Sequence, residues 1–595
     1  MCTVLFGEHG VAKDSSARLF ADEELISRYL DVYANHQESL KQLVDKCLEL
    51  NKTELAEFTQ RWMPDRDPSR EYFFLLPDNR ELEFPKLNDQ TDRFWAGNLK
   101  KRNAKYAAEL LSLAVRANEK KNDELAFRLL HECLFHDPTN QGAARVLSYV
   151  ESEPRVKKNT YSRKEKLLPD GNVMKFESDH FVLFTTVDEK LARQAIQRFE
   201  RWHIVWRQMF YNYWAQSSWL SRRFETEVKP IRRTKKFKVF LYKDRDEYIR
   251  KLKPISPGIE VSVGYYLFSE KTSFFYADKS SNDSTWIHEL THQFMHETIP
   301  VSSKSRIQSS IWAVEGIAIY MESYVDFGTY STLGGEDAER LHFCRHNFFR
   351  RGFFVPIDDL NEMSQQEFVQ NENVTGLYSL SGAYCHFVLR HHKLKKEFLK
   401  FLQLVHQGKN SNVFFGRLTS QLSFDQEFKK FLQPSKAEIE NSLLQPARYK
   451  ILYLGYSDVD DETLELLKDA TRLETLDLSE TRVTSAGIEK LKRLTGLQYL
   501  SLERTKVSDA CFEQVGAFTD LAELDLTMTA VTDSGVSKMT GLQKLQILWV
   551  AGTRVSDRSV DSLLKLKSLQ KMDIRKSGIT EAGKKRLNGR VNLID

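Results

Sequence analysis

A leucine that returns every 24 residues dominates the last quarter of this chain. It begins units of the form LxxLxLxxTxVTDxG, such as LETLDLSETRVTSAG and LAELDLTMTAVTDSG. A fixed period over so many units indicates that each unit adopts one small structure and buries its apolar face against its neighbour. The pattern therefore predicts stacked strands and helical segments over residues 448–595. The leucines that mark the period are Leu473, Leu497, Leu521, Leu545 and Leu569.

These units resemble leucine-rich repeats. An earlier, less regular copy begins at Tyr449, so we expect about six units in an α/β solenoid. A hydroxyl residue stands where such repeats usually hold asparagine, and a threonine hydroxyl can bond to the turn backbone in its place. The residues at this phase are Thr481, Thr505, Thr529, Thr553 and Ser577.

Repeat arrays of this kind recognise proteins on their concave strands, so a protein partner is expected there. Trp549, beside Ile547, is either an exposed anchor for that partner or a residue that packs against a neighbouring domain. The positions expected on the concave strands are Tyr453, Asp477, Ser501, Asp525, Trp549 and Asp573.

A histidine pair in WIHELTHQF carries the most specific chemistry. His288 and His292 are four residues apart, which places both imidazoles on one face of a helix, where they can bind one zinc ion. Glu289 then lies within reach of the zinc-activated water as general base. The pattern HExxHxxGxxH is excluded because Met295 and Thr298 replace its glycine and third histidine. The alternative is a structural helix with surface histidines.

The third zinc ligand is expected in IWAVEGIAIYMES. Glu315 follows His292 by 23 residues, across a polar segment long enough to reverse direction and begin a second helix. Gly316 and Ala318 are small, which would let the two helices approach closely. Glu322, two turns further on, would orient a histidine ligand from behind.

HELTH followed by WAVEGIAIY resembles the gluzincin metallopeptidases, over roughly residues 172–440. This resemblance implies an α+β peptidase domain in which His288, His292 and Glu315 bind Zn²⁺ and Glu289 is the base. More narrowly, the chain is similar to uncharacterised bacterial gluzincin-like proteins that carry tetratricopeptide or leucine-rich repeats.

The resemblance also implies a substrate-binding edge strand before the zinc helix, for which Thr272–Ala277 is well positioned. A donor for the developing oxyanion is expected in YSLSGAYCHFVLRHH. Tyr378 is the first choice, and Tyr384 and His386 are the alternatives. His296 is expected to be a surface histidine or to lie behind the ligands.

The rest of the chain divides by pattern into a multidomain protein. Residues 1–105 form a helical N-terminal region. Residues 106–152 resemble a tetratricopeptide-like helical hairpin that changes helix at DPTN, either as part of a peptide-binding array or as a packing element. A basic stretch at 153–171 is expected to be a linker, and the peptidase domain occupies 172–447.

Composition excludes several other classes. Lys and Arg number 87 against 83 Asp and Glu, a net charge of +4, so no nucleic-acid partner is expected. No run of about 18 apolar residues predicts a membrane span. The first ten residues lack a signal-peptide core, which favours the cytoplasm. Six scattered cysteines form no CxxC pair and favour free thiols, although Cys344 and Cys385 could pair across space.

Two functions follow. The first is a zinc-dependent peptidase that hydrolyses peptide bonds of a peptide or protein substrate, with repeats that recruit it. The second is a non-catalytic interaction scaffold in which the peptidase fold is vestigial. The intact Glu289 favours the first.

Overall fold

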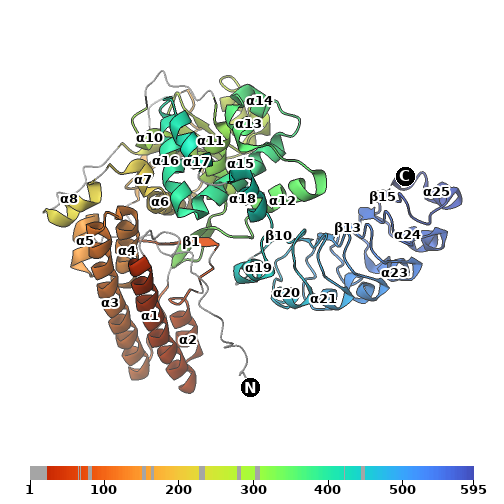
Figure 1. Ribbon diagram of the computed structural model, residues 1–595, viewed down its shortest axis with the longest axis horizontal. Coiled ribbons are helices and arrows are strands. Elements are labelled where there is room, and N and C mark those ends of the chain that lie inside the picture. Colours follow the sequence, from red (N-terminus) through yellow and green to blue (C-terminus); the bar gives the residue numbers. More distant parts are fainter. Residues whose placement is uncertain are drawn as a thin grey trace.

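The chain folds into a helical N-terminal part, a central body of helices and sheets, and a curved array at the carboxyl end (Figure 1). The ten N-terminal residues that bear on a signal peptide lie outside the described residues. The computed structural model describes residues 23–64, 66–67, 69–77, 83–149, 156–161, 166–216, 218–226, 235–277, 283–301, 309–420, 423–443, 446 and 449–595.

The N-terminal part is built around α3, which runs unbroken through the boundary expected at 105/106. Asn122 caps α4, and Asn140 caps α5 after the DPTN turn, so the helix change at DPTN is confirmed. Nearly every residue of α4 is buried, which fits a packing element. The helices are α1 (Glu23–Glu49), α2 (Thr53–Gln60), α3 (Gln90–Glu119), α4 (Asp123–His136) and α5 (Gln141–Leu147).

The N-terminal region is not purely helical, contrary to expectation. Strand β1 (Arg70–Phe74) pairs antiparallel with β9 (Tyr330–Gly334) of the central body, and β8 (Val325–Asp326) completes a three-stranded sheet. Phe73 and Phe74 are buried in two different apolar clusters, one on each side of β1. A strand of five residues that pairs with a segment 260 positions away leaves no local periodic signal, so the pattern missed it.

A six-stranded sheet in the order β2-β3-β4-β5-β7-β6 forms one layer of the central body. Its centre is parallel, and helices α6 (Glu189–Met209) and α9 (Arg245–Leu252) lie in the crossover connections. The strands are β2 (Lys157–Thr160), β3 (Met174–Glu177), β4 (Phe181–Thr185), β5 (Phe237–Tyr242), β6 (Gly264–Leu267) and β7 (Thr272–Tyr276).

Two expectations about this sheet are corrected. The segment expected as a linker contributes β2, which pairs antiparallel with β3. The strand expected at the edge, β7, lies between β5 and β6 and is buried throughout. All five residues of TSFFY are buried, which fits a strand covered on both faces, and the edge is β6 instead.

Helices cover the sheet, and α10, expected from Asp283 onward, is confirmed. Helix α11 lies between α10 and α15, and its Gly316 faces α15: a Cβ there would overlap the Ser381 carbonyl oxygen and lie 2.7 Å from Cys385 Sγ. The small residue therefore permits a close approach to α15, not to α10. The helices are α7 (Tyr211–Trp214), α8 (Trp219–Glu225), α10 (Asp283–Thr298), α11 (Ile311–Glu322), α12 (Glu339–Arg351), α13 (Ile357–Glu362), α14 (Gln365–Val369), α15 (Val374–Arg390), α16 (His392–His406), α17 (Asn412–Ser420), α18 (Phe424–Phe431) and α19 (Lys436–Ser442).

The predicted repeats are confirmed as a solenoid whose strands pair in parallel with a shift of 24 residues per repeat between β10 and β15. The strands are β10 (Ile451–Tyr453), β11 (Thr475–Asp477), β12 (Tyr499–Ser501), β13 (Glu523–Asp525), β14 (Ile547–Trp549), β15 (Lys571–Asp573) and a closing β16 (Asn592–Ile594). Helical segments lie opposite: α20 (Asp461–Glu465), α21 (Ser485–Glu489), η5 (Asp509–Cys511), α22 (Phe512–Val515), α23 (Asp533–Ser537), η6 (Lys538–Gly541), η7 (Asp557–Ser559), α24 (Val560–Leu563) and α25 (Glu581–Leu587).

Hydroxyl and carboxylate side chains form hydrogen bonds within each repeat and between neighbouring repeats. The Thr481 hydroxyl donates to the Leu478 carbonyl over 2.7 Å, and the equivalent threonines of the next three repeats do the same. The sequence pattern did not predict a second set of hydrogen bonds, between neighbouring repeats. Asp509 accepts from the backbone N–H and the hydroxyl of Thr532, which lies in the next repeat. Asp461, Asp533 and Asp557 repeat this contact with Thr484, Ser556 and Thr580.

Helix α12 of the central body lies against the strand side of the solenoid (Figure 1). Arg350 Nη2 lies 3.0 Å from a Glu503 carboxylate oxygen and 3.6 Å from one of Asp525, and the Phe349 ring stacks on Tyr456. Asp477 and Asp525, which we expected to face a partner, are buried here. The first repeats are thus occupied by the protein's own helix.

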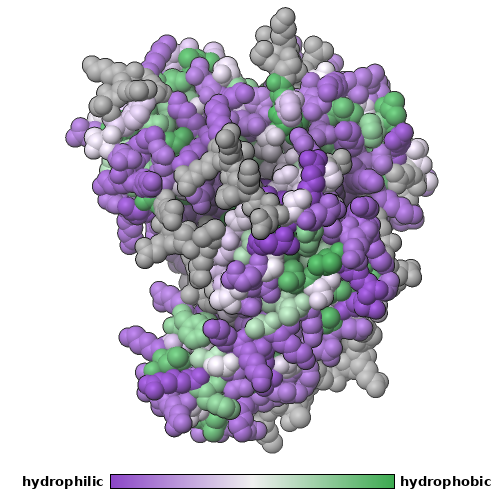
Figure 2. Space-filling view, turned by 90° about the vertical axis from the view of Figure 1, so that its left-hand side faces the viewer, coloured by the Kyte–Doolittle hydropathy of each residue, from purple (hydrophilic) through white to green (hydrophobic). Residues whose placement is uncertain are grey.

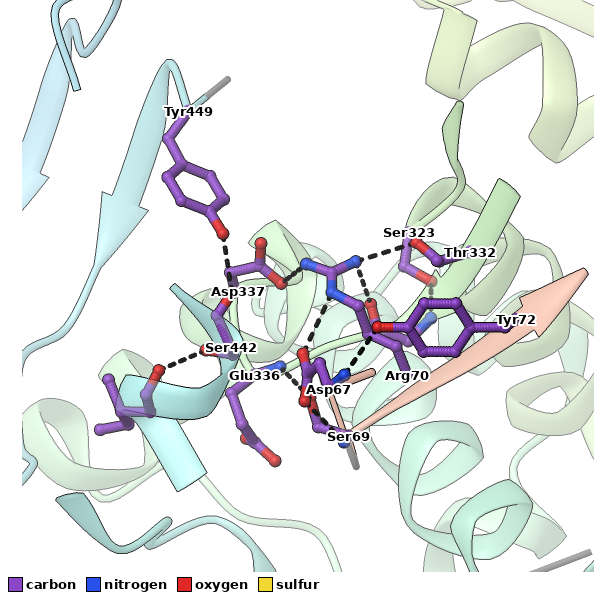
Figure 3. Close-up of polar contacts among 12 residues, drawn as sticks. Asp67, Ser69, Arg70, Tyr72, Ser323, Thr332, Glu336, Asp337, Ser442 and Tyr449 are labelled. Carbon is purple, nitrogen blue, oxygen red and sulfur yellow. Dashed lines mark hydrogen bonds and ion pairs between the residues drawn. The ribbon is translucent and has the colours of Figure 1, made fainter. Parts of the chain in front are cut away.

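A buried arginine joins all three parts of the chain (Figure 3). Arg70, on β1, forms ion pairs with Asp67 and with Asp337, which comes from the central body. Tyr449, at the start of the solenoid, lies within electrostatic reach of the same Asp337, and its hydroxyl donates to the Ser442 carbonyl over 2.8 Å. A buried charge with two carboxylate partners is costly to break, so this cluster fixes the parts in one arrangement.

The five cysteines within the described residues are all free and buried, so Cys344 and Cys385 do not pair. Among the described helices, none has the length and apolar character needed to cross a bilayer. One side of the molecule is mainly hydrophilic at its surface, with scattered apolar side chains (Figure 2).

Candidate metal centre

Helices α10 and α11 bring together the three side chains expected to bind zinc. His288 and His292 lie one turn apart on α10, and Glu315 lies in the first half of α11. The two imidazole Nε2 atoms are 3.2 Å apart, and Glu315 Oε2 is 3.4 Å from His288 Nε2 and 3.6 Å from His292 Nε2. These residues are one of two groups of possible metal ligands among the described residues.

This triangle fits zinc in size and in chemistry. Tetrahedral zinc with nitrogen and oxygen donors at about 2.0–2.2 Å places neighbouring donors about 3.3–3.6 Å apart. Two imidazole nitrogens and a carboxylate oxygen at such distances repel each other as lone pairs unless a cation or a proton lies among them. The donor set of two histidines and one glutamate is one that zinc uses in hydrolytic sites.

One carboxylate behind the expected ligands, that of Glu322, fixes the orientation of the His288 ring. Glu322 Oε1 is 2.7 Å from His288 Nδ1, and its other oxygen is 3.1 Å from Arg340 Nε. A proton held on Nδ1 leaves Nε2 of His288 as the lone pair that faces the other donors. Glu322 therefore contacts a histidine from behind, as its spacing of two helical turns from Glu315 predicted.

Glu315 and Glu322 together set the charge of the centre. Burial alone would lower the pKa of His288, but Glu315 and Glu322 outweigh burial and raise this pKa to about 10. Burial opposes ionisation of Glu315, yet the two histidines hold its pKa far below the usual range. Two carboxylates beside a buried histidine therefore favour a proton or another cation among these donors.

Glu289 lies between the metal centre and the edge of the sheet. Its Oε2 accepts a hydrogen bond of 2.8 Å from the backbone N–H of Tyr266 on β6. Burial raises the pKa of Glu289, while His288 and His292 act in the opposite direction. Sequence reasoning missed Tyr266, because a backbone donor on a neighbouring strand has no residue-type signal.

The three candidates for the oxyanion donor lie in different surroundings on α15. Tyr378 is half-buried, is within electrostatic reach of Glu315 and Glu289, and forms no hydrogen bond within the described chain. The Tyr384 hydroxyl instead donates to Asp425 over 2.9 Å, and its ring stacks on Phe428. This arrangement leaves Tyr378 as the candidate whose hydroxyl is available.

The two other histidines considered in the sequence, His386 and His296, lie outside the metal triangle. His386 is 1% exposed and packs on the ring of Tyr320, with both ring nitrogens unpaired. His296 Nδ1 is 2.7 Å from the Tyr266 hydroxyl, and its ring packs on Phe268. His296 therefore packs against β6 and the residue that follows it, and the polar and ring contacts of its side chain within the described residues do not include the three expected ligands.

The buried His386 predicts a dependence of stability on pH. Burial lowers its pKa to about 3, against roughly 6.5 in an unfolded chain. The stabilisation is therefore complete above pH 6.5 and is lost as the pH falls toward the folded pKa, because only the unfolded chain takes up the proton. Between pH 7.5 and 5 this one histidine should remove about 2 kcal/mol from the free energy of unfolding.

The measurement compares urea unfolding of the wild type and His386→Phe at both pH values, with chelator present so that metal release does not contribute. The variant should lose about 2 kcal/mol less than the wild type on acidification. An equal loss in both proteins would show that His386 is not a source of the acid sensitivity.

Comparisons with solved structures find partial similarity to internalins. No protein-family profile matches the chain, and no curated protein matches it. Among solved structures, an internalin (inlF) from Listeria monocytogenes is similar over 27% of this chain and 57% of its own, with 18% identity and a TM-score of 0.20. An internalin C2 from the same organism is similar over 26% of this chain and 80% of its own, with 16% identity and a TM-score of 0.18. The assignment of the repeats rests on their own parallel strands.

Proposed function

We propose that residues 172–447 form a gluzincin-like zinc peptidase domain that hydrolyses peptide bonds. The observation that carries this proposal is the triangle of His288, His292 and Glu315, whose edges of 3.2, 3.4 and 3.6 Å match those of a tetrahedral zinc site. The three donors converge from two helices far apart in the sequence, beside an exposed sheet edge. A helix with a purely structural role would not require three metal-binding side chains at these distances.

The residues around the centre suit hydrolysis of an amide. When bound, zinc would supply Lewis acidity toward a carbonyl group and toward water. Glu289 is placed to take a proton and deliver it to the leaving amine, since its carboxylate lies between the centre and β6. Strand β6 ends the described sheet, so the backbone groups of its outer edge, other than the Tyr266 N–H that Glu289 holds, can pair with an extended peptide.

The test is the metal content and peptidase activity of the full chain. The wild type should bind zinc at this site and cleave peptides, lose activity in chelator and regain it with zinc. Glu315→Gln should lower zinc affinity by roughly 10-fold or more, because a neutral amide replaces a charged ligand. A wild type in which no zinc depends on Glu315 would overturn the proposal.

Tyr378 is proposed as the donor that stabilises the oxyanion. Tyr378→Phe should lower kcat by roughly 10²- to 10³-fold with unchanged zinc content, as loss of one such donor does elsewhere. Tyr384→Phe is the matched control, since it removes a hydroxyl bonded to Asp425. It should cost about 1–3 kcal/mol of stability and leave kcat unchanged. Full kcat in Tyr378→Phe would remove this residue from the mechanism.

A second candidate function, recruitment of a protein partner, rests on the solenoid. Its first repeats are occupied by α12, whereas Trp549 of the fifth repeat is half-buried and held by neighbours within the solenoid. The Trp549 indole N–H donates to Glu523 over 2.7 Å, and Lys571 Nζ lies 5.0 Å from the ring centre. A positioned aromatic ring among charged neighbours is a typical anchor for a protein partner.

In the full chain, Trp549→Ala should weaken cleavage of a native protein target by roughly 10-fold or more and spare a short peptide. Leu466→Ala is the control, because Leu466 is exposed in the first repeat, after α20. Equal effects of Trp549→Ala on both substrates would argue against recruitment. Binding of a partner without any peptide cleavage by the wild type would favour the scaffold.

A further inference from the structure

A second group of possible metal ligands lies outside the α10–α11 centre. His180 is in the turn between β3 and β4, while Glu200 and His203 are three residues apart on one face of α6. Their donor atoms all lie within 4.8 Å of one another. This group of two histidines and one glutamate repeats the donor chemistry of the first centre on separate elements.

Glu200 holds the turn that carries His180. Its Oε1 accepts from the backbone N–H of His180 over 2.7 Å, and its Oε2 is 2.7 Å from His180 Nδ1. The His180 side chain is 31% exposed, so the group can be reached from solvent on that side.

His203 is the residue that packing does not explain. It is 5% exposed, its Nδ1 has no hydrogen-bond partner, and its ring lies 5.3 Å from both Phe237 and Phe294. A phenylalanine would suit this aromatic surrounding, whereas a buried unpaired ring nitrogen costs about 1–3 kcal/mol.

The rings of His180 and His203 are also close, with centroids 4.4 Å apart. Arg207, one turn further along α6, is a positive charge near the group, and its guanidinium lies over the ring of Trp214, at 4.1 Å. Two imidazoles and one carboxylate are ligands that zinc and cobalt accept readily.

We propose that His180, Glu200 and His203 form a second metal site, which binds a divalent transition ion such as Zn²⁺ and clamps the β3–β4 turn to α6. The ion would give the buried His203 a partner. It would also join the β3–β4 turn to α6, which within this group are otherwise connected only by the hydrogen bonds of Glu200. Three protein ligands leave the fourth position of a tetrahedral ion to a water molecule on the solvent side. This inference does not depend on peptidase activity.

Cobalt titration of the full chain tests the site, with visible absorption of Co²⁺ and metal analysis after dialysis as readouts. The wild type should bind two equivalents. His180→Gln, a change at a half-exposed position, and His203→Phe, which suits the aromatic surrounding, should each bind one. The pair His288→Gln with His292→Gln should also bind one, and adding His180→Gln to it should leave none.

The outcomes separate the two sites. If the variant without His288 and His292 binds no ion, or if His180→Gln and His203→Phe bind as much as the wild type, the second site is overturned. If only His180→Gln and His203→Phe lose metal, the second site stands and the first centre fails. Circular dichroism of each variant shows that a lost equivalent is not a lost fold.

Discussion

Glu289→Gln should abolish peptide hydrolysis while the protein keeps its fold and its zinc. The carboxylate oxygen that accepts from Tyr266 N–H at 2.8 Å becomes part of a neutral amide, which cannot take a proton. General-base catalysis contributes about 10²- to 10⁴-fold, so we expect a fall of that size in kcat. Because His288, His292 and Glu315 are untouched, zinc content should remain that of the wild type.

The matched control is Glu297→Gln on the same helix. Glu297 accepts from Gln293 over 2.8 Å and belongs to no proposed step of the reaction. It should keep kcat within roughly a factor of two to three, the usual scatter of single contacts. Equal cleavage by the wild type and Glu289→Gln would end the proposal of a metallopeptidase and leave the interaction scaffold.

Gly316→Ala should damage both stability and activity, although the change adds one methyl group. The new Cβ would overlap the Ser381 carbonyl oxygen of α15, which cannot rotate away as a side chain can. Alanine gains about 1 kcal/mol in helix propensity over glycine, whereas overpacking costs about 1–3 kcal/mol and more against backbone. We therefore expect a net loss of stability in thermal or urea unfolding.

The same change should move Glu315, the neighbouring residue. A displacement of about 1 Å at a catalytic group costs on the order of 10²-fold in rate, and zinc affinity should fall as well. Gly97→Ala is the control, because Gly97 lies in α3 with nothing near its Cβ position. It should raise stability by up to about 1 kcal/mol. A stable, fully active Gly316→Ala would show that α11 and α15 can separate without moving the ligand.

Local patterns predicted the parts of the molecule that local contacts build. The solenoid followed from its leucine period because each repeat contacts only its neighbours. The pairing of His288 with His292 followed from helical spacing, and the approach of Glu315 from its position on the next helix and from the resemblance. By contrast, Tyr384 and His386 could not be told from Tyr378, since all three share one helix and differ only in what surrounds them.

The sequence by itself thus determined the repeats, the zinc-binding pattern and the balanced charge, all of which depend on residue types at short separations. Only the tertiary structure decided that β6 rather than β7 is the sheet edge, that β1 belongs to the central body, and that Gly316 serves α15. It also decided that α12 covers Asp477 and Asp525 of the solenoid. The reason is physical: strand order, helix contacts and domain docking are set by the burial of surfaces distant in sequence, which no local period records.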